Sequence, residues 1–135
     1  MQTNWEIKKF SNLSLEEFHD IIHLRIEVFV IEQDCPYQDL DGKDKMAYHV
    51  FCKNEKNEII ATSRLLAKGI SYEEVAIGRI VTSQKARGNG LGHALLKKSM
   101  ELCEEKFGLG PIRLSAQKHL EGYYNRHGFF TTGKE

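Results

Sequence analysis

The chain contains 135 residues, and its 19 Lys and Arg residues balance its 19 Asp and Glu residues, so its formal charge is zero. This balance provides no overall field that would hold nucleic acid or an anionic membrane, and neither partner is expected. Hydrophobic residues (41%) and charged residues (28%) occur at the frequencies of a folded chain. The length predicts a single domain over residues 1–135.

The three cysteines, Cys35, Cys52 and Cys103, show no C-x-x-C spacing. An odd number in this arrangement excludes a closed disulfide framework and a zinc ribbon, and no metal is expected. The first residues lack the basic flank and apolar run of a signal peptide, and no apolar stretch reaches the ~20 residues that span a bilayer. We therefore expect a soluble, cytoplasmic protein.

The elements begin with a weakly alternating strand at residues 5–10. Ser14 and Glu17 have the spacing of a capping box, which predicts the start of an amphipathic helix running to about Val30. Its apolar positions follow at three- and four-residue steps: Leu15, Phe18, Ile22, Ile26 and Phe29. Residues 32–45, with a proline, a glycine and several acids, are predicted to form a loop.

Two β-branched and aromatic stretches, at 47–53 and 59–67, flank a turn at 54–57 and predict an antiparallel hairpin. A further strand is expected at 75–82. From Gly88 onward a long helix follows, with an apolar face at Leu91, Leu95, Leu102, Cys103 and Phe107.

That helix is expected to end at Gly108 or Gly110, before a short strand at 112–116 and a short helix at 120–127. A strand, a helix and a strand in succession require the strands at 75–82 and 112–116 to be parallel. The predicted fold is therefore an α/β (α+β) domain with a mixed central sheet, antiparallel in its N-terminal part, and helices on both faces.

One segment carries a chemical signal. Arg87-Gly88-Asn89-Gly90-Leu91-Gly92 lies between a strand and a helix, and helix N-termini with unpaired N–H groups bind anions. Glycines allow the backbone to approach a phosphate closely. No Walker motif is present, and the glycine spacing differs from the dinucleotide fingerprint. The segment indicates a phosphate-bearing ligand, with a plain connecting turn as the alternative.

The same segment resembles the R/Q-x-x-G-x-G/A motif of the GNAT superfamily of N-acetyltransferases. Downstream, Tyr123-Tyr124-Asn125-Arg126-His127-Gly128-Phe129 is similar to the Y-x-x-x-G-F ending of that superfamily, and residues 24–37 are similar to its ElaA-like branch. The resemblance implies acetyl-CoA as co-substrate, bound in a splay between the two parallel strands. It places these residues at the coenzyme: Ile80, Val81, Arg87, Gly88, Asn89, Gly90, Leu91, Gly92, Gln117 and Tyr123.

Within that resemblance, the Val81 N–H would polarise the thioester carbonyl, and Tyr124 would protonate the departing thiolate as the general acid. The alternatives are an ordinary core strand residue for Val81 and a plain aromatic side chain for Tyr124. Chains of this branch continue past Gly128-Phe129 into a final strand, which this chain is expected to lack or truncate.

The acceptor side rests on weaker signals. The predicted loop contains two lysines and five acids, Glu32, Asp34, Asp39, Asp41 and Asp44. This acidic excess would suit an amine or a basic peptide terminus as acceptor, and a solvated loop is the alternative. His49, alone in a strand, is typical of a core or surface residue rather than a base.

Two functions of different kinds follow from these expectations. The first is an enzyme that transfers an acetyl group from acetyl-CoA to a primary amine of a small molecule or peptide, by direct attack in a ternary complex. The second is a non-catalytic sensor or interaction module that only binds acyl-CoA. The sequence does not name the acceptor, and it leaves open whether two copies form a homodimer.

Overall fold

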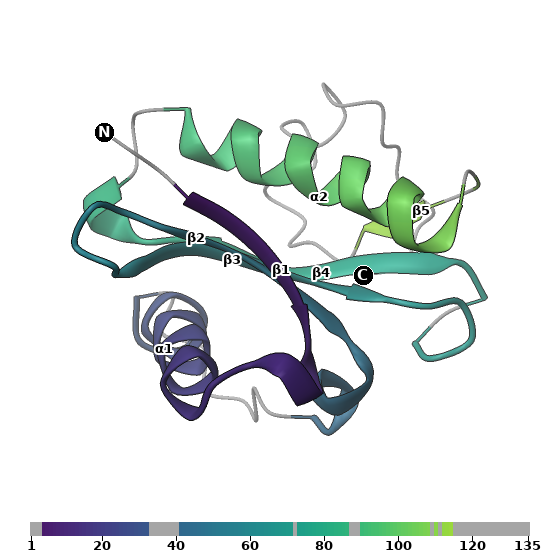
Figure 1. Cartoon of the computed structure of the whole chain (residues 1–135), viewed down its shortest axis with the longest axis horizontal. Coiled ribbons are helices and arrows are strands. Elements are labelled where there is room, and N and C mark those ends of the chain that lie inside the picture. Colours follow the sequence, from purple (N-terminus) through teal and green to yellow (C-terminus); the bar gives the residue numbers. More distant parts are fainter. Residues whose placement is uncertain are drawn as a thin grey trace.

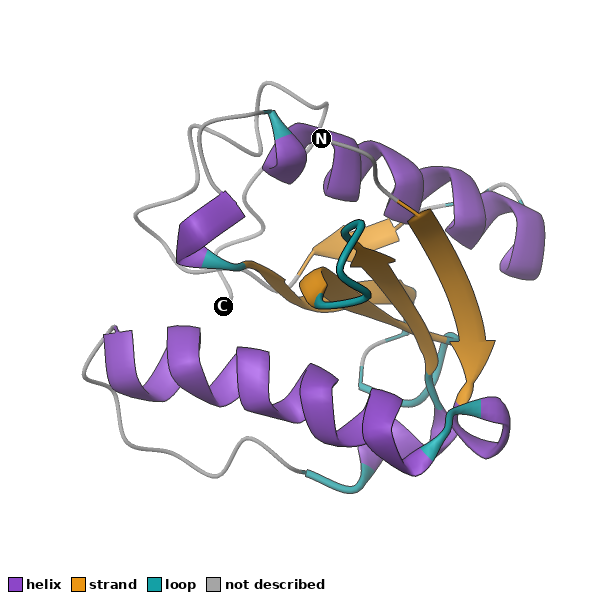
Figure 2. Cartoon of the chain, turned by 60° about the vertical axis from the view of Figure 1, so that its left-hand side comes forward, coloured by secondary structure: helices purple, strands orange, loops and turns teal. Residues whose placement is uncertain are grey.

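In the part of the chain that the structure describes, a mixed sheet of five strands lies between two long helices (Figure 1). The computed structural model describes residues 4–32, 41–71, 73–86, 90–108, 110 and 112–114. The strands are β1 (Asn4–Lys9), β2 (Tyr48–Lys53), β3 (Ile59–Leu66), β4 (Val75–Thr82) and β5 (Ile112–Leu114), and the α-helices are α1 (Leu15–Arg25) and α2 (Leu91–Phe107). Figure 2 shows the sheet in orange, with α1 and α2 in purple on its opposite faces. The predicted α/β class is confirmed.

The strands are ordered β1-β2-β3-β4-β5, so their order in the sheet follows their order in the chain. β1 to β4 are antiparallel neighbours, which confirms the predicted hairpin of β2 and β3. β5 lies parallel to β4, with Ile77 opposite Leu114 at the end of their pairing. The predicted parallel pair is therefore confirmed, since α2 carries the chain from the end of β4 back to the start of β5.

The start of α1 is fixed by the capping box that the sequence predicts. Ser14 Oγ accepts a hydrogen bond from the Glu17 N–H at 3.0 Å, and Glu17 Oε1 accepts one from the Ser14 N–H at 3.0 Å. The Glu17 carboxylate also binds two ammonium groups, Lys8 Nζ at 2.9 Å and Lys53 Nζ at 3.1 Å. The cap thus joins α1 to β1 and β2.

These contacts predict a loss of stability in acid. Burial alone would raise the pKa of Glu17, but the Ser14 N–H and the Lys8 and Lys53 ammoniums lower it to about 2. A folded-state pKa below the unfolded value gives stabilisation that is complete above pH 4.5 and disappears as the pH falls toward 2. Glu17→Gln should remove about 2–3 kcal/mol of unfolding free energy at pH 7 and flatten the profile in that window.

Urea unfolding at a series of pH values measures this effect. Glu16→Gln is the matched control, because Glu16 lies exposed in the same helical turn and the substitution changes the net charge equally. Equal pH profiles for the two variants would contradict the role assigned to Glu17.

The first helix departs from its prediction at Leu15, which is 92% exposed instead of buried on the apolar face, and again after Arg25. Residues Ile26–Glu32 continue as a π-helix, whose wider turns rotate the later side chains away from the α-helical positions. Val28 therefore becomes the buried residue, whereas Ile26, predicted on the apolar face, is 37% exposed. Phe29 remains partly buried against Leu24 and Val28.

The core divides between the two faces of the sheet. On the α2 side, strand residues such as Val50, Leu65 and Ile77 pack against Leu91 and Leu95 of α2. On the α1 side, Ile21 and Ile22 pack against Phe51, and Leu24 packs with Val28 against Val81. Strand alternation explains this division for β2, where the neighbours Val50 and Phe51 point to opposite faces.

Candidate functional site

The glycine segment lies where β4 leads into α2, as the sequence predicts. Gly90 is the N-cap of α2 and has a left-handed backbone with φ of 74°. Leu91 is buried in the core and anchors the first turn, while Gly92 is partly buried beside it. Arg87, Gly88 and Asn89 lie outside the described residues.

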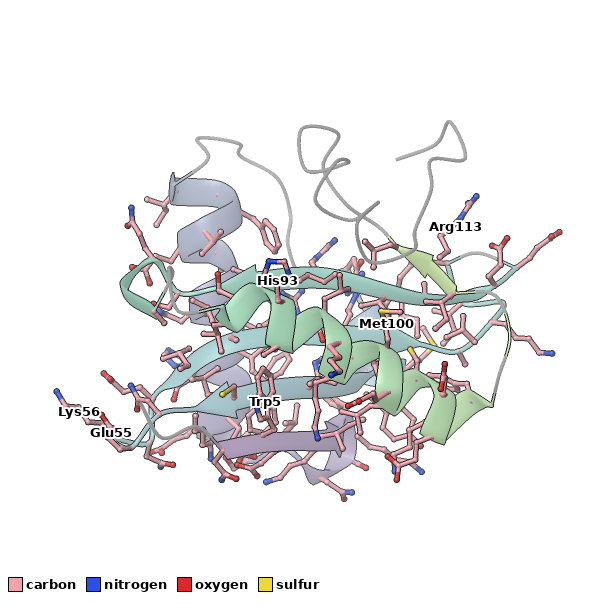
Figure 3. All side chains as sticks on the ribbon, turned by 90° about the horizontal axis from the view of Figure 1, so that it is seen from above. Trp5, Glu55, Lys56, His93, Met100 and Arg113 are labelled. Carbon is pink, nitrogen blue, oxygen red and sulfur yellow. The ribbon has the colours of Figure 1, made fainter. Side chains whose placement is uncertain are left out.

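The N-terminus of α2 is open and electropositive. Among the described residues, no side chain caps it, and no acidic residue occurs in its first turn, where Figure 3 shows His93. A Cβ built on Gly90 would meet nothing within 4 Å, so none of the described residues fills the space beside the backbone there. The first N–H groups of this 17-residue helix are oriented to attract an anion, because helix N-termini carry unpaired donors and the positive end of the helix dipole.

β4 contains a β-bulge just before this turn. Gly78 pairs with Arg64 and Val81 pairs with Thr62, so two residues of β4 stand opposite one residue of β3. The first of the two, Arg79, has a φ of 50°, a left-handed conformation that costs a non-glycine residue roughly 1–2 kcal/mol. The bulge also shifts by one residue the alternation of side chains between the two faces of the sheet. The Val81 side chain therefore faces α1, whereas that of Ile77 lies on the α2 side.

The bulge decides the direction of the backbone N–H groups that follow it. Ser83 N–H donates to the Ile60 carbonyl of β3 at 2.7 Å. Since N–H directions alternate along an antiparallel strand, the Val81 N–H also points to β3. The N–H of Ile80 accordingly faces the opposite side of β4, which is the side of β5.

On that side, β4 extends past its described partner. The pairing with β5 ends at Ile77 and Leu114, whereas β4 continues to Thr82. Among the described residues, the second half of β4 has no strand partner on this side, and the Ile80 N–H belongs to it. The splay of the two strands stays a prediction, because residues 115 and 116 lie outside the described part of the chain.

A chain of ion pairs links α1, the segment around residues 41–44, β3 and β4. Arg25 Nη1 and Nη2 donate to the Asp44 carboxylate at 2.8 and 3.2 Å. Arg64 donates to both oxygens of Asp41 at 2.8 Å and also reaches Asp44 at 3.2 Å. Arg79 Nη2 lies 3.4 Å from Asp41 Oδ2. We call these five residues the Arg–Asp network.

Sequence reasoning missed this network, although a signal was present. Arg25 lies within the apolar face of a helix, and Arg64 lies within an apolar strand. A charge at such a position requires a buried partner. Arg25, Asp44 and Arg64 are indeed 1, 2 and 5% exposed.

The network changes the interpretation of the acidic loop. The Arg64 hydrogen bonds hold the pKa of Asp41 well below its ordinary value. Burial alone would raise the pKa of Asp44, but Arg25 and Arg64 bring it below its ordinary value. Both carboxylates are ionised and engaged by arginines, so they do not form an acidic rim for an amine. The Asp34 and Asp39 positions lie outside the described residues.

His49 is a buried core residue, as its position in a strand predicts. Its Nε2 lies 2.9 Å from the Asp44 carbonyl, and its Nδ1 has no hydrogen-bond partner among the described residues. Burial lowers the pKa of His49 and keeps the ring neutral near pH 7. It therefore supports the segment around Asp44 rather than acting as an exposed base.

Neither described cysteine is suited to nucleophilic chemistry. Cys52 and Cys103 are buried, and burial raises the pKa of the Cys103 thiol to about 12. The remaining predicted site residues, Gln117, Tyr123 and Tyr124, lie outside the described residues, so their roles stay predictions.

Two absences concern the described residues alone. No group of three or more His, Cys, Asp or Glu side chains is arranged there to hold a metal ion. None of the helices in that part of the chain is long and apolar enough to cross a membrane.

Comparisons with known proteins extend these observations. A family model described as an acetyltransferase (GNAT) domain matches residues 10–135. Protein ElaA of Escherichia coli K12 is 37% identical over 126 residues, which cover 93% of this chain and 82% of ElaA. The crystal structure of Escherichia coli ElaA has a TM-score of 0.91 at 34% identity, covering 98% of this chain and 90% of that one.

Two other solved structures are similar. The crystal structure of an acyl-CoA N-acyltransferase from Pseudomonas aeruginosa has a TM-score of 0.92 at 38% identity, covering 98% of this chain and 92% of that one. A predicted acetyltransferase from Clostridium acetobutylicum, crystallised with acetyl-CoA, has a TM-score of 0.70 at 19% identity. The match covers 99% of this chain and 94% of that one, so the two proteins share the fold.

Proposed function

Because the chain belongs to the GNAT acetyltransferase family, we propose that it transfers an acetyl group from acetyl-CoA to a primary amine by direct attack in a ternary complex. The observation that carries the proposal is the glycine-capped N-terminus of α2, which is separated from the bulged half of β4 by residues 83–89. This arrangement offers an anion site and, close to it in the chain, an N–H group on the β5 side of β4.

The N–H groups of residues 87–92 would bind the coenzyme pyrophosphate. Three features support this assignment: the left-handed Gly90, the free space where its side chain would be, and the absence of acids from the first turn. Arg87 would add a positive charge beside the phosphates. The Clostridium acetobutylicum protein with acetyl-CoA shares this fold.

The Ile80 N–H would donate to the thioester carbonyl, where negative charge develops during acyl transfer. The resemblance assigns this role to Val81, and we propose Ile80 in its place because the pairing of Val81 with Thr62, followed by the hydrogen bond from the Ser83 N–H to the Ile60 carbonyl, favours a Val81 N–H directed to β3. Val81 instead contributes its side chain to the packing of α1.

The attacking amine must be neutral, and the departing thiolate must receive a proton. Tyr124 would supply that proton, since a phenol with a pKa near ~10 can donate to a thiolate whose conjugate acid has a pKa near ~8.5. Direct attack needs no covalent enzyme intermediate, in agreement with the inert environments of Cys52 and Cys103.

Two measurements on the full chain test the proposal. Calorimetry with acetyl-CoA and with free coenzyme A should show binding at one site. Thiol release from acetyl-CoA in the presence of a panel of small amines and basic peptides should then exceed hydrolysis without amine. Absence of binding would refute the proposal, whereas tight binding without amine-dependent thiol release would identify a non-catalytic acyl-CoA sensor.

A further inference from the structure

The conformation of Arg79 requires an explanation. Left-handed backbone is typical of glycine, and arginine adopts it only where its surroundings hold it there. The register places the bulge at Arg79 and Ile80, so the strained residue directly precedes the proposed carbonyl donor, the Ile80 N–H. Whatever stabilises this conformation also positions that donor.

The Arg–Asp network supplies such a contact. Asp41 Oδ2 lies 3.4 Å from Arg79 Nη2 and accepts a 2.8 Å hydrogen bond from Arg64 Nη2. Arg64 stands opposite Gly78 in the β3–β4 register, one residue before Arg79. Asp41 therefore connects the Arg79 side chain, which lies in the bulge, to Arg64 of the neighbouring strand β3.

Asp41 is itself held in place from the other side. Its Oδ1 accepts a hydrogen bond from the Lys43 N–H at 3.0 Å. Further along the same segment, Asp44 is fixed by Arg25 of α1 and by Arg64. The carboxylate thus sits on a braced segment, and its position does not depend on Arg79.

From these contacts we propose that Asp41 is a positioning residue for acyl transfer: through Arg79 it holds the β4 bulge in the conformation that presents the Ile80 N–H. The inference rests on the proposed function, because it assigns that N–H a role in the reaction. Asp41 contacts neither coenzyme nor acceptor in this account. It acts only through the backbone conformation at residue 79.

Three substitutions test whether the backbone conformation of residue 79 controls the activity. Arg79→Ala removes the contact with Asp41 but keeps a Cβ that disfavours positive φ. Arg79→Gly removes the same contact and adopts positive φ without penalty. Asp41→Asn weakens the contact while leaving Arg64 paired with Asp44 at 3.2 Å, so the fold is expected to survive.

Arg79→Ala and Asp41→Asn should each lower kcat about tenfold, with little change in KM for acetyl-CoA. Arg79→Gly should retain several times more activity than Arg79→Ala, and Asp41→Asn should cost much less in the Arg79→Gly background than in the native chain. Glu17→Gln serves as the control for general loss of stability, because it breaks an ion-pair cluster elsewhere on the sheet and should leave kcat unchanged.

A second measurement follows the backbone conformation directly and does not depend on acetyl transfer. Backbone carbon and nitrogen chemical shifts of residue 79 report the sign of φ, and should move toward extended values in Asp41→Asn and Arg79→Ala but not in Arg79→Gly. Unchanged shifts in Asp41→Asn, or equal activity loss in Arg79→Gly and Arg79→Ala, would overturn the proposal. If the native chain binds no acetyl-CoA, the proposed function fails, while the shifts still decide whether Asp41 holds the bulge.

Discussion

Tyr124→Phe should lower kcat by about 10²–10⁴-fold while barely changing the affinity for acetyl-CoA. The substitution keeps the aromatic ring and removes only the hydroxyl that would protonate the departing thiolate. Loss of general acid catalysis affects the chemical step rather than coenzyme binding. Steady-state kinetics with an accepted amine, together with calorimetry on the same variant, measure both quantities.

Tyr123→Phe is the matched control, because it removes an identical hydroxyl one residue away. Its effect on kcat should be mild. A large loss in Tyr123→Phe, or near-full kcat in Tyr124→Phe, would show that the acid has been assigned to the wrong residue. The pH profile of kcat adds a further check, since the basic limb should change when the phenol is removed.

Gly90→Ala should raise the Kd for coenzyme A roughly 10- to 100-fold, which corresponds to the loss of one or two hydrogen bonds to a charged phosphate. Two effects act together. The new Cβ occupies the open space beside the helix N-terminus, and alanine disfavours the φ of 74° that aims the following N–H groups. Calorimetric titration with coenzyme A measures the change.

The same helix provides a matched control at its other end. Gly108 is the C-cap of α2 and has a φ of 85°, and a Cβ added there would likewise meet nothing within 4 Å. Gly108→Ala should therefore lower the melting temperature at least as much as Gly90→Ala does, because the ψ of 174° at Gly108 is less accessible to alanine than the ψ of 13° at Gly90, and it should not affect coenzyme affinity. If both variants bind coenzyme A equally well, the phosphate site does not lie at the N-terminus of α2.

Local signals in the sequence predicted the elements well. The spacing of Ser14 and Glu17 located the start of α1, and both hydrogen bonds of the capping box are present. The β-branched stretches around the turn at residues 54–57 predicted the hairpin of β2 and β3. Such signals are reliable because the interacting groups are three or four residues apart, or in adjacent strands joined by a short turn.

Two local departures were not predictable in the same way. The π-helix after Arg25 buries Val28 beneath Val81, a residue far along the chain in β4. The bulge at Arg79 breaks the two-residue period of β4 within a run that otherwise pairs regularly. In each case the backbone departs from its regular period to satisfy contacts with distant elements.

The sequence by itself determined the order of strands and helices, the parallel pairing of β4 and β5, and the glycine-rich entry to α2. These follow from periodicity, caps and the topology of a β-α-β unit, all of which act over short stretches of chain. Only the tertiary structure decided that Asp41 and Asp44 serve arginines instead of an acidic rim, and that β4 carries a bulge at Arg79. The partners in the network are separated by 19 to 38 residues, and no local pattern records which buried arginine a given carboxylate will meet.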